Sequence, residues 1–446
     1  MKTTLDPGWL RDAAAALVEA NRAFGRAYPG EPAGRQPVHT VYGGAQLFAA
    51  DSIPKLGRVG LAAMDRYAPD AAVLGRALGL GGHPMLPRIH QRVRAKLTAE
   101  PVEDFRIDFE DGYGNRPDPE EDGHAIAIAD ALAAGARGGT LSPFIGIRIK
   151  PLNEELRVRS IRTLDLVQTA LAERGVLPGG WVVTIPKITV LEQVRFAVAA
   201  LGELERKLGL AGGTLWFEAM VETPQLVLDG SGRSLLPRLL EASEGRLRGA
   251  HFGTYDFTAG LNITAAHQRM RHPACDFAKN VMQLAFAGTP VWLSDGSTTV
   301  LPVPVHREEA GTPLTAAQRA ANIEGVHAAW RLHFEDVRHS LAGGFYQGWD
   351  LHPAQLVSRY AALYSFFLDG IEAAGVRLRN FVGRAAQATL IGDVFDDAAT
   401  GQGLLNFFLR GINSGAITEA EALEMTGLTA DDLRGRSFLR IMRSRA

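Results

Sequence analysis

The chain has 446 residues, 46% of them hydrophobic and 22% charged, which is enough for a core larger than one ordinary domain needs. Its formal net charge of −2 argues against a nucleic acid or an anionic membrane surface as partner. A single cysteine, Cys275, excludes an internal disulfide and is read as a structural thiol. The first residues, MKTTLDPGWLRD, lack the apolar core of a signal peptide, and no apolar run approaches the ~18 residues that span a bilayer. We therefore expect a cytoplasmic protein without a membrane partner.

Residues 1–36 are predicted to be an N-terminal helical segment. Leu10, Leu17 and Phe24 recur at helical spacing within residues 8–29, and Pro29-Gly30 ends that pattern. Eight strand candidates follow, separated by longer stretches, several with helical periodicity, such as 120–132, 154–171, 190–208 and 323–340. The strand candidates are residues 38–43, 105–109, 144–149, 181–186, 215–221, 249–253, 290–293 and 344–351.

Strands that alternate with helices pair in parallel, because each parallel pair needs a crossover. Eight such units predict an α/β fold, a closed (β/α)8 TIM barrel over residues 37–370. Two segments exceed a minimal barrel: a long first crossover at 44–104, and an insert at 294–322 that reads as a loop, typical of lids or of disorder. Residues 371–446 are predicted to be a helical C-terminal extension, with helices near 402–412 and 419–425.

Two neighbouring strand candidates end on a carboxylate. Glu222 follows the apolar run 215–221 directly, before Thr223-Pro224, and Asp256 follows 249–253 within three residues. The carboxyl ends of barrel strands are where such folds carry their chemistry. Two oxygen donors there suit a hard divalent ion such as Mg²⁺. The alternative makes Glu222 a helix N-terminal carboxylate and Asp256 a turn former or helix cap.

The second strand candidate ends in an acidic cluster, DFEDGYG, residues 108–114. Asp108, Glu110 and Asp111 would repel one another unless a cation or hydrogen-bond donors lie nearby. A solvated turn is the alternative, which the glycines favour. Because the strand itself is apolar, we favour a functional role for the acids.

Two cations come from the next two strands. Arg148 lies in the apolar strand FIGIRI and needs an anionic partner, because burying an unpaired charge is costly. That partner is either the acidic cluster or a substrate carboxylate or enolate oxygen. Lys187 follows the fourth strand at the same rim. A Schiff-base role for Lys187 is conceivable, but neighbouring metal-binding carboxylates disfavour it.

The order of these segments resembles a known family. IDFEDGYG resembles the DLEDAV-type motif of the citrate lyase β-subunit and malyl-CoA lyase group, within the HpcH/HpaI aldolase superfamily. GIRIKPLN is similar to that family's strand with the essential arginine, TIPKI to its PK strand, AMVETPQ to its IET segment and FGTYDF to its G-x-x-D segment. GWDLHPAQL, residues 348–356, resembles its GK-x-x-HP-x-Q sequence. Six matches in the family's order, spread from about residue 38 to 356, make the resemblance specific.

The resemblance implies a barrel of the pyruvate/phosphoenolpyruvate type that binds Mg²⁺, or Mn²⁺, through Glu222 and Asp256. Arg148 would orient the keto-acid end of the substrate and stabilise its enolate, and Glu110 and Asp111 would hold metal-bound waters. The implied reaction is carbon–carbon cleavage by a lyase or aldolase through a metal-bound enolate, on a 2-oxo acid or a CoA thioester. Such barrels tend to be homo-oligomers, trimers or hexamers.

The sequence departs from the family at both ends. Residues 38–48, VHTVYGGAQLF, stand where the family has a VPG-type loop, so His39 and Tyr42 are candidate substrate contacts there. Lys187, in the TIPKI segment, is a further candidate substrate contact. A capped core histidine is an equal alternative for His39. The family's CoA-thioester lyases use a C-terminal acid from an adjacent subunit, and GDVFDDA offers Asp396 as that proton-moving group. The insert has no family counterpart, so the family's substrate does not transfer.

Two other functions compete with the enzyme. A catalytically silent barrel would bind a metabolite as a sensor or scaffold, although a silent relative would be free to lose the carboxylates or Arg148. Alternatively, the acids and Arg148 form only an internal ion-pair network. That network predicts no metal affinity, so Glu222→Gln would change stability alone.

Overall fold

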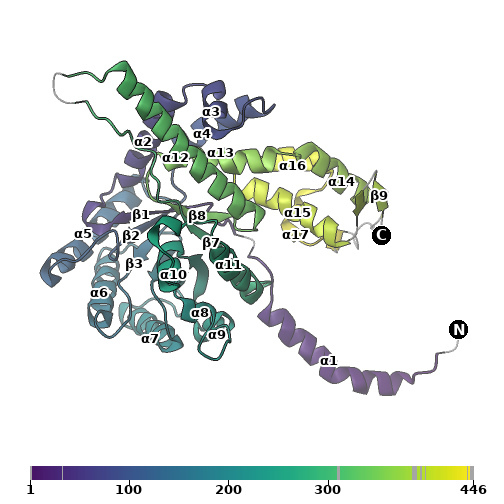
Figure 1. The fold of residues 1–446 in the computed structure, drawn as a ribbon. Coiled ribbons are helices and arrows are strands. Elements are labelled where there is room, and N and C mark those ends of the chain that lie inside the picture. The colour runs from purple at the N-terminus through teal and green to yellow at the C-terminus, as the bar shows by residue number, and fades with distance from the viewer. Residues whose placement is uncertain are drawn as a thin grey trace.

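The computed structural model describes residues 3–32, 34–308, 312–383, 389–391, 394–396, 398–438 and 440–441. Eight parallel strands close into a barrel, with β8 pairing with β1 (Figure 1). This confirms the predicted (β/α)8 TIM barrel. The strands are β1 (Thr40–Gly44), β2 (Asp104–Asp108), β3 (Phe144–Arg148), β4 (Trp181–Ile185), β5 (Trp216–Val221), β6 (Leu247–Phe252), β7 (Trp292–Ser297) and β8 (Gln347–Asp350).

Helices surround the barrel and cover the outside of its strands (Figure 1). Every residue of β2 and of β4 is buried. The helices from the first strand to the last are α2 (Ser52–Tyr67), α3 (Ala71–Leu78), α4 (Leu86–Ala99), α5 (Asp118–Gly138), α6 (Arg157–Glu173), α7 (Leu191–Leu208), α8 (Pro224–Val227), α9 (Leu236–Ala242), α10 (Thr254–Gly260), α11 (Pro273–Phe286), α12 (Ala316–Ala342) and α13 (Gln355–Leu368), with short 3₁₀ turns η1 (Ala45–Leu47) and η2 (Ala265–His267).

The predicted insert at 294–322 is wrong at both of its ends. β7 continues through Ser297, because the buried Asp295 is neutralised by Lys279 at 2.9 Å and accepts a hydrogen bond from Ser340. The run Ser-Asp-Gly-Ser therefore forms strand instead of the turn that its composition indicates. At the other end α12 already begins at Ala316, where Thr315 and Gln318 form a capping box.

The inside of the barrel holds a charged network below the carboxyl ends of the strands. Arg106 Nη1 lies 2.6 Å from Asp104 Oδ1, and its Nη2 lies 2.7 Å from Glu218 Oε2. Burial raises the pKa of Glu218, but the charge of Arg106 outweighs burial and holds that pKa below its ordinary value. His251 Nε2 lies 3.3 Å from Glu218, and its Nδ1 accepts a hydrogen bond from the Trp349 indole at 3.3 Å. The network thereby reaches a side chain that faces the cavity described below.

The C-terminal extension docks on the barrel through Gln36. The Gln36 backbone exchanges two hydrogen bonds with Asn413, of 2.8 and 3.1 Å, while its side chain bonds to Gln347 and to the Leu293 carbonyl. Arg410 also donates to Gln36 Oε1 at 2.7 Å. The extension comprises α14 (Ile371–Gly383), α15 (Ala398–Asn413), α16 (Glu419–Thr426) and α17 (Ala430–Gly435), with the antiparallel pair β9 (Thr389–Ile391) and β10 (Val394–Asp396).

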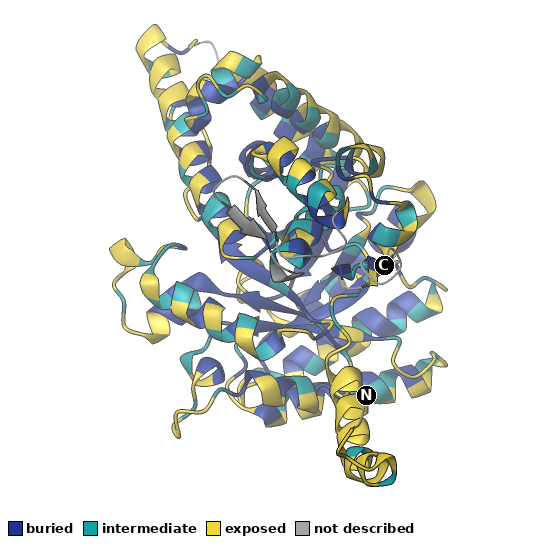
Figure 2. Ribbon diagram, turned by 90° about the vertical axis from the view of Figure 1, so that its right-hand side faces the viewer, coloured by how far each residue is buried: buried dark blue, intermediate teal, exposed yellow. Residues whose placement is uncertain are grey.

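The N-terminal helix α1 (Pro7–Ala27) contributes no buried residue and leads away from the barrel (Figures 1 and 2). The Asp6 side chain caps it by accepting a hydrogen bond from the Trp9 amide. Its apolar stripe is open to solvent, with Leu17 60% and Phe24 65% exposed. Among the described residues, no helix has the length and apolar character needed to cross a bilayer.

Candidate active site

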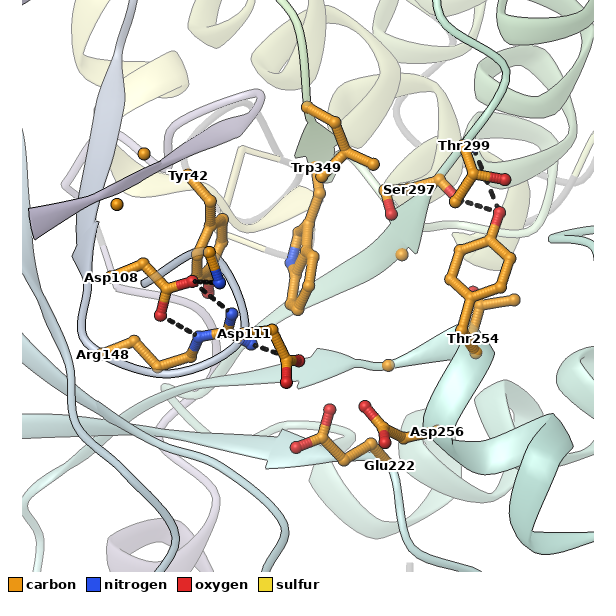
Figure 3. A pocket seen from close by; sticks show the side chains of 17 residues that line it. Tyr42, Asp108, Asp111, Arg148, Glu222, Thr254, Asp256, Ser297, Thr299 and Trp349 are labelled. Carbon is orange, nitrogen blue, oxygen red and sulfur yellow. Dashed lines mark hydrogen bonds and ion pairs between the residues drawn. The ribbon is translucent and has the colours of Figure 1, made fainter. Parts of the chain in front are cut away.

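A cavity of about 380 Å³ opens at the carboxyl ends of the barrel strands (Figure 3). Its walls come from strands far apart in the sequence, as the closed barrel requires. The lining side chains include both aromatic and charged groups. They are Tyr42, Asp108, Asp111, Arg148, Glu222, Thr254, Tyr255, Asp256, Ser297, Thr299, Trp349 and Leu351, with the backbone of Gly43, Gly44, Gly112, Gly253 and Gly296.

Arg148 is fixed at one wall by the acids that follow β2. Its Nε and Nη2 donate to the two Asp108 oxygens at 2.7 and 2.6 Å, and its Nη1 lies 2.8 Å from Glu110 Oε2. Burial raises the pKa of Asp108, but Arg148 and the amides of Glu110 and Gly112 outweigh it and lower that pKa. The guanidinium has more N–H groups than these contacts use, so Arg148 keeps donors for a ligand. The predicted pairing of Arg148 with the acidic cluster is therefore present.

An aromatic wall covers Arg148. The guanidinium carbon lies 4.9 Å from the Tyr42 ring centre and 6.0 Å from that of Trp349. The two rings pack on each other at 4.5 Å. These faces stabilise the cation and shield it from water, so a charge that develops beside Arg148 would feel it strongly.

Glu222 and Asp256 lie side by side at the opposite wall (Figure 3). Glu222 is buried at the end of β5, whereas Asp256 is partly exposed in the first turn of α10. Burial, together with the charges of Glu110 and Asp256, raises the pKa of Glu222 to about 8. A Cβ on Gly253 would stand 2.5 Å from Glu222 Oε2, so the close approach of the two strand ends needs glycine here.

The chemistry of this pair suits a hard cation. A buried carboxyl whose neighbours are acids is stabilised by a proton or by a metal ion. Within the described part of the chain, no group of three or more His, Cys, Asp or Glu side chains is arranged to hold a metal. A pair of carboxylates still fits Mg²⁺, which usually keeps several of its waters and takes one or two protein carboxylates.

Lys187 lies between the two walls. Its ammonium pairs with Glu110 and lies 3.4 Å from Asp111 and 3.5 Å from Asp256. Burial lowers the pKa of Lys187, but Glu110 and Glu222 outweigh burial and hold that pKa above its ordinary value. A lysine that keeps its proton is a poor nucleophile, which argues against the Schiff-base alternative.

Three of the predicted site residues, Glu110, Lys187 and His39, are not among those that line this cavity. Glu110 and Lys187 contact lining residues, Arg148 and Asp111 respectively. His39 is fully buried beside the cavity. Its Nε2 accepts a hydrogen bond from the Glu103 amide and its Nδ1 donates to Asp350 Oδ2 at 2.7 Å, which is the capped core position that the sequence left as its alternative. A substrate contact of His39 stays a prediction. Asp396 belongs to β10, and its side chain lies outside the described residues.

Other lining residues were missed in the sequence. The sequence does not predict Ser297 and Thr299 at the cavity, because the seventh strand candidate ends at Leu293. Tyr255 stands inside the FGTYDF segment and donates to the Ser297 carbonyl at 2.9 Å, and Thr254 Oγ1 is buried without a hydrogen-bond partner among the described residues. The position of Trp349, near the end of the predicted strand 344–351, was the available signal for an aromatic wall.

Solved structures that are similar to this chain include a citrate lyase and a malate synthase. A citrate lyase from Burkholderia xenovorans LB400 shares 19% identity with a TM-score of 0.54, over 75% of this chain and 91% of that chain. Malate synthase from Haloferax volcanii is also found, in its lead(II) complex at 15% identity, TM-score 0.46, over 91% of this chain and 98% of that one, and in its magnesium/glyoxylate complex at 16% identity, TM-score 0.47, over 90% and 97%. At these identities the likeness to the citrate lyase shows the TIM-barrel fold alone.

Among curated proteins, none matches the chain. A family model does match, over residues 17–441, which includes the barrel, the carboxylate pair and the C-terminal extension. The chain belongs to the family described as a domain of unknown function, DUF6986.

Proposed function

We propose that this protein is a Mg²⁺-dependent carbon–carbon lyase or aldolase, with Mn²⁺ as a possible substitute, that acts through an enolate on a 2-oxo acid or a CoA thioester. One observation carries the proposal. A guanidinium fixed by Asp108 and a carboxylate pair, Glu222 and Asp256, face each other across a single cavity of about 380 Å³. The sequence resemblance to the HpcH/HpaI superfamily supports it independently.

Glu222 and Asp256 would hold the metal. When bound, the ion would supply Lewis acidity toward the carbonyl oxygen of the substrate. The protein's own contribution begins with Arg148, whose remaining N–H groups bind the carboxylate or the developing oxyanion. A preorganised donor of this kind is typically worth about 3 kcal/mol of transition-state stabilisation.

Proton transfer is assigned to the acids beside Arg148. Glu110 is buried, and burial raises its pKa although Arg148 opposes the rise. Its carboxyl lies beside Arg148 and Lys187, where it would position a water that takes the substrate proton. Asp111 lies at the mouth with its side chain 61% exposed, where it can position water. Tyr42 and Trp349 exclude bulk water from the opposite side.

The silent-barrel alternative draws on a specific contact. Arg148 and Lys187 already pair with four of the acids, namely Asp108, Glu110, Asp111 and Asp256, so the described ion pairs balance much of the negative charge without a metal. A sensor or scaffold would keep such an arrangement. The test must therefore report both metal dependence and chemistry.

The deciding experiment is exchange of solvent deuterium into a methyl group, followed by NMR, with pyruvate in one sample and acetyl-CoA in another. Each is run with and without Mg²⁺ on the wild type and on Glu222→Gln. We expect Mg²⁺-dependent exchange that Glu222→Gln reduces by at least roughly 100-fold, the scale of losing one transition-state contact. Glu203→Gln, which alters an exposed ion pair with Arg206, is the matched control and should behave as the wild type.

The two substrates separate the possibilities. Exchange into pyruvate alone identifies an aldolase of 4-hydroxy-2-oxo acids, and exchange into acetyl-CoA identifies a thioester lyase. Exchange into neither substrate, with no effect of Mg²⁺, contradicts the enolate mechanism for both and favours the silent barrel. The proposed trimer or hexamer is tested separately, by sedimentation of the purified protein.

A further inference from the structure

Lys187 has an unusual backbone at the end of β4. Its φ of 50° puts it in the left-handed region, which only four non-glycine residues adopt in the described part of the chain. For a residue with a long side chain this conformation is strained, and strain beside a functional site calls for a reason. The ammonium of Lys187 contacts two residues that line the cavity, Asp111 and Asp256.

The left-handed conformation lets Lys187 contact both carboxylates of the pair, one with its backbone amide and the other with its side chain. The Lys187 amide donates to Glu222 Oε1 at 2.7 Å, which orients the buried member of the carboxylate pair. The same residue's ammonium approaches Asp256, the other member, at 3.5 Å, while pairing with Glu110 and Asp111. Its cationic group is thus placed among the acids that the proposed function gives to the metal.

We infer that Lys187 is an internal cation that occupies the acidic cluster of the metal-free protein and must withdraw when Mg²⁺ binds between Glu222 and Asp256. This rests on the proposed function, because it needs a metal at that pair. An ammonium and a divalent ion repel each other, so Mg²⁺ on Asp256 disfavours the Lys187 ammonium that now lies 3.5 Å from that carboxylate. Lys187 therefore sets how much Mg²⁺ is needed to fill the site.

The side chain has somewhere to go. It is 29% exposed and unbranched, and Asp111 beside it opens to solvent. The ammonium can swing outward with Asp111 while the backbone amide keeps its bond to Glu222. The ion pair of Arg148 with Asp108 is independent of this movement, since both are held by their own hydrogen bonds.

The test is the dissociation constant of Mg²⁺ by calorimetry, and of Mn²⁺ by electron paramagnetic resonance, in the full chain without substrate. Lys187→Asn removes the ammonium and suits the left-handed backbone, and Lys187→Met keeps the length of the side chain. We expect both variants to bind at least about tenfold more tightly than the wild type. Lys55→Met removes an exposed lysine that pairs with Asp51 and should leave the constant unchanged.

The outcomes separate this inference from the proposed function. If the wild type binds, Glu222→Gln abolishes binding, and the Lys187 variants bind no more tightly than the wild type, the inference is overturned while the metal site stands. If no variant binds and Glu222→Gln changes nothing, the proposed function falls and the inference falls with it.

A second measurement follows the side chain directly. Acetylation of lysines by a soluble reagent, read by mass spectrometry, should modify Lys187 slowly in metal-free protein and several-fold faster at saturating Mg²⁺. Lys55 reports the intrinsic rate of an exposed lysine in the same sample. Equal rates at Lys187 with and without bound Mg²⁺ would contradict the withdrawal of its ammonium.

Discussion

Gly253 separates β6 from α10 and leaves room for the Glu222 carboxylate. A methyl group at this position would meet Glu222 Cβ and Oε2 at 2.5 Å each, closer than packed atoms allow. Because Glu222 is buried at the end of β5, it cannot yield without leaving the cavity wall. The lack of one side chain therefore decides whether the carboxylate pair exists.

Gly253→Ala should fold but lose the pair. We expect Mg²⁺ affinity to fall at least tenfold, as when a supporting contact of a metal ligand is lost, with about 1–3 kcal/mol of stability lost to overpacking. Calorimetric titration and urea unfolding measure the two effects. Gly123→Ala, in α5 with open space around it, is the matched control and should be stabilised by about 0.5–1 kcal/mol. Unchanged affinity in Gly253→Ala would show that Glu222 does not ligate the ion.

At the residue scale the sequence pointed to the charged residues and to Tyr42, which line the cavity, but not to the hydroxyl side chains beside them. The roles of these residues stay predictions. A charge in or beside an apolar strand costs free energy unless it has a partner. The sequence therefore marks Arg148, Glu222 and Asp256 as residues with a specific role. Thr254 and Ser297 carry no such cost, and their place at the cavity depends on where the strands end. The sequence could not predict that His39 is buried against Asp350, because that contact joins residues more than 300 positions apart.

Helix α7 is fastened to the strands it packs on by a single buried acid. Glu205, near its end, accepts from Arg246 with both oxygens at 2.7 Å and from the amides of Gly213 and Leu215. Burial raises the pKa of Glu205, but these donors outweigh it and lower the pKa to about 2. The ionised side chain thereby ties the helix to the starts of β5 and β6.

The lowered pKa of Glu205 makes the stability of the fold depend on pH in a defined direction. Stability from Glu205 is fully present above its unfolded pKa, near 4.5, and is lost as the pH falls toward 2. At pH 7, Glu205→Gln should lose about 3 kcal/mol, because Arg246 is left without its charged partner. Unfolding by urea between pH 7 and pH 3 should show this difference shrinking as the wild type is protonated.

Glu203 lies on the same helix and provides the comparison. Its pairs with Arg206 and Lys207 are exposed and screened by water, so Glu203→Gln should leave stability essentially unchanged at either pH. A Glu205→Gln deficit that is independent of pH would assign the loss to packing and not to charge.

Among the elements, the sequence predicted all eight strands and missed one boundary that mattered. The periodicity of apolar runs finds buried strands directly. It cannot find the end of β7, because Asp295 and Gly296 have turn composition and become strand only through Lys279, a residue of α11. Polar residues inside a strand depend on partners that a local pattern does not contain.

Gln36, the last residue of the N-terminal segment, links the barrel to the C-terminal extension. It bonds to Gln347 of β8 and to Arg410 of α15. Gln36→Ala removes the oxygen to which Arg410 donates and the amide group that donates to Gln347. We expect a loss of about 2–3 kcal/mol and faster hydrogen exchange in α15 than in β2. Thermal unfolding and exchange mass spectrometry measure these. A double-mutant cycle with Arg410→Ala, whose guanidinium donates to Gln36 Oε1, should give a coupling of about 0.5–3 kcal/mol. Zero coupling would mean that this hydrogen bond does not hold the extension.

The separation of α1 from the barrel has a consequence for how the molecule moves in water. A helix of 21 residues is about 30 Å long, comparable with the diameter of a small domain. An arm of that length displaces solvent far from the centre of mass, so rotation about the arm meets less friction than rotation that swings it. The protein will tumble as an elongated particle, although most of its mass lies in a closed barrel.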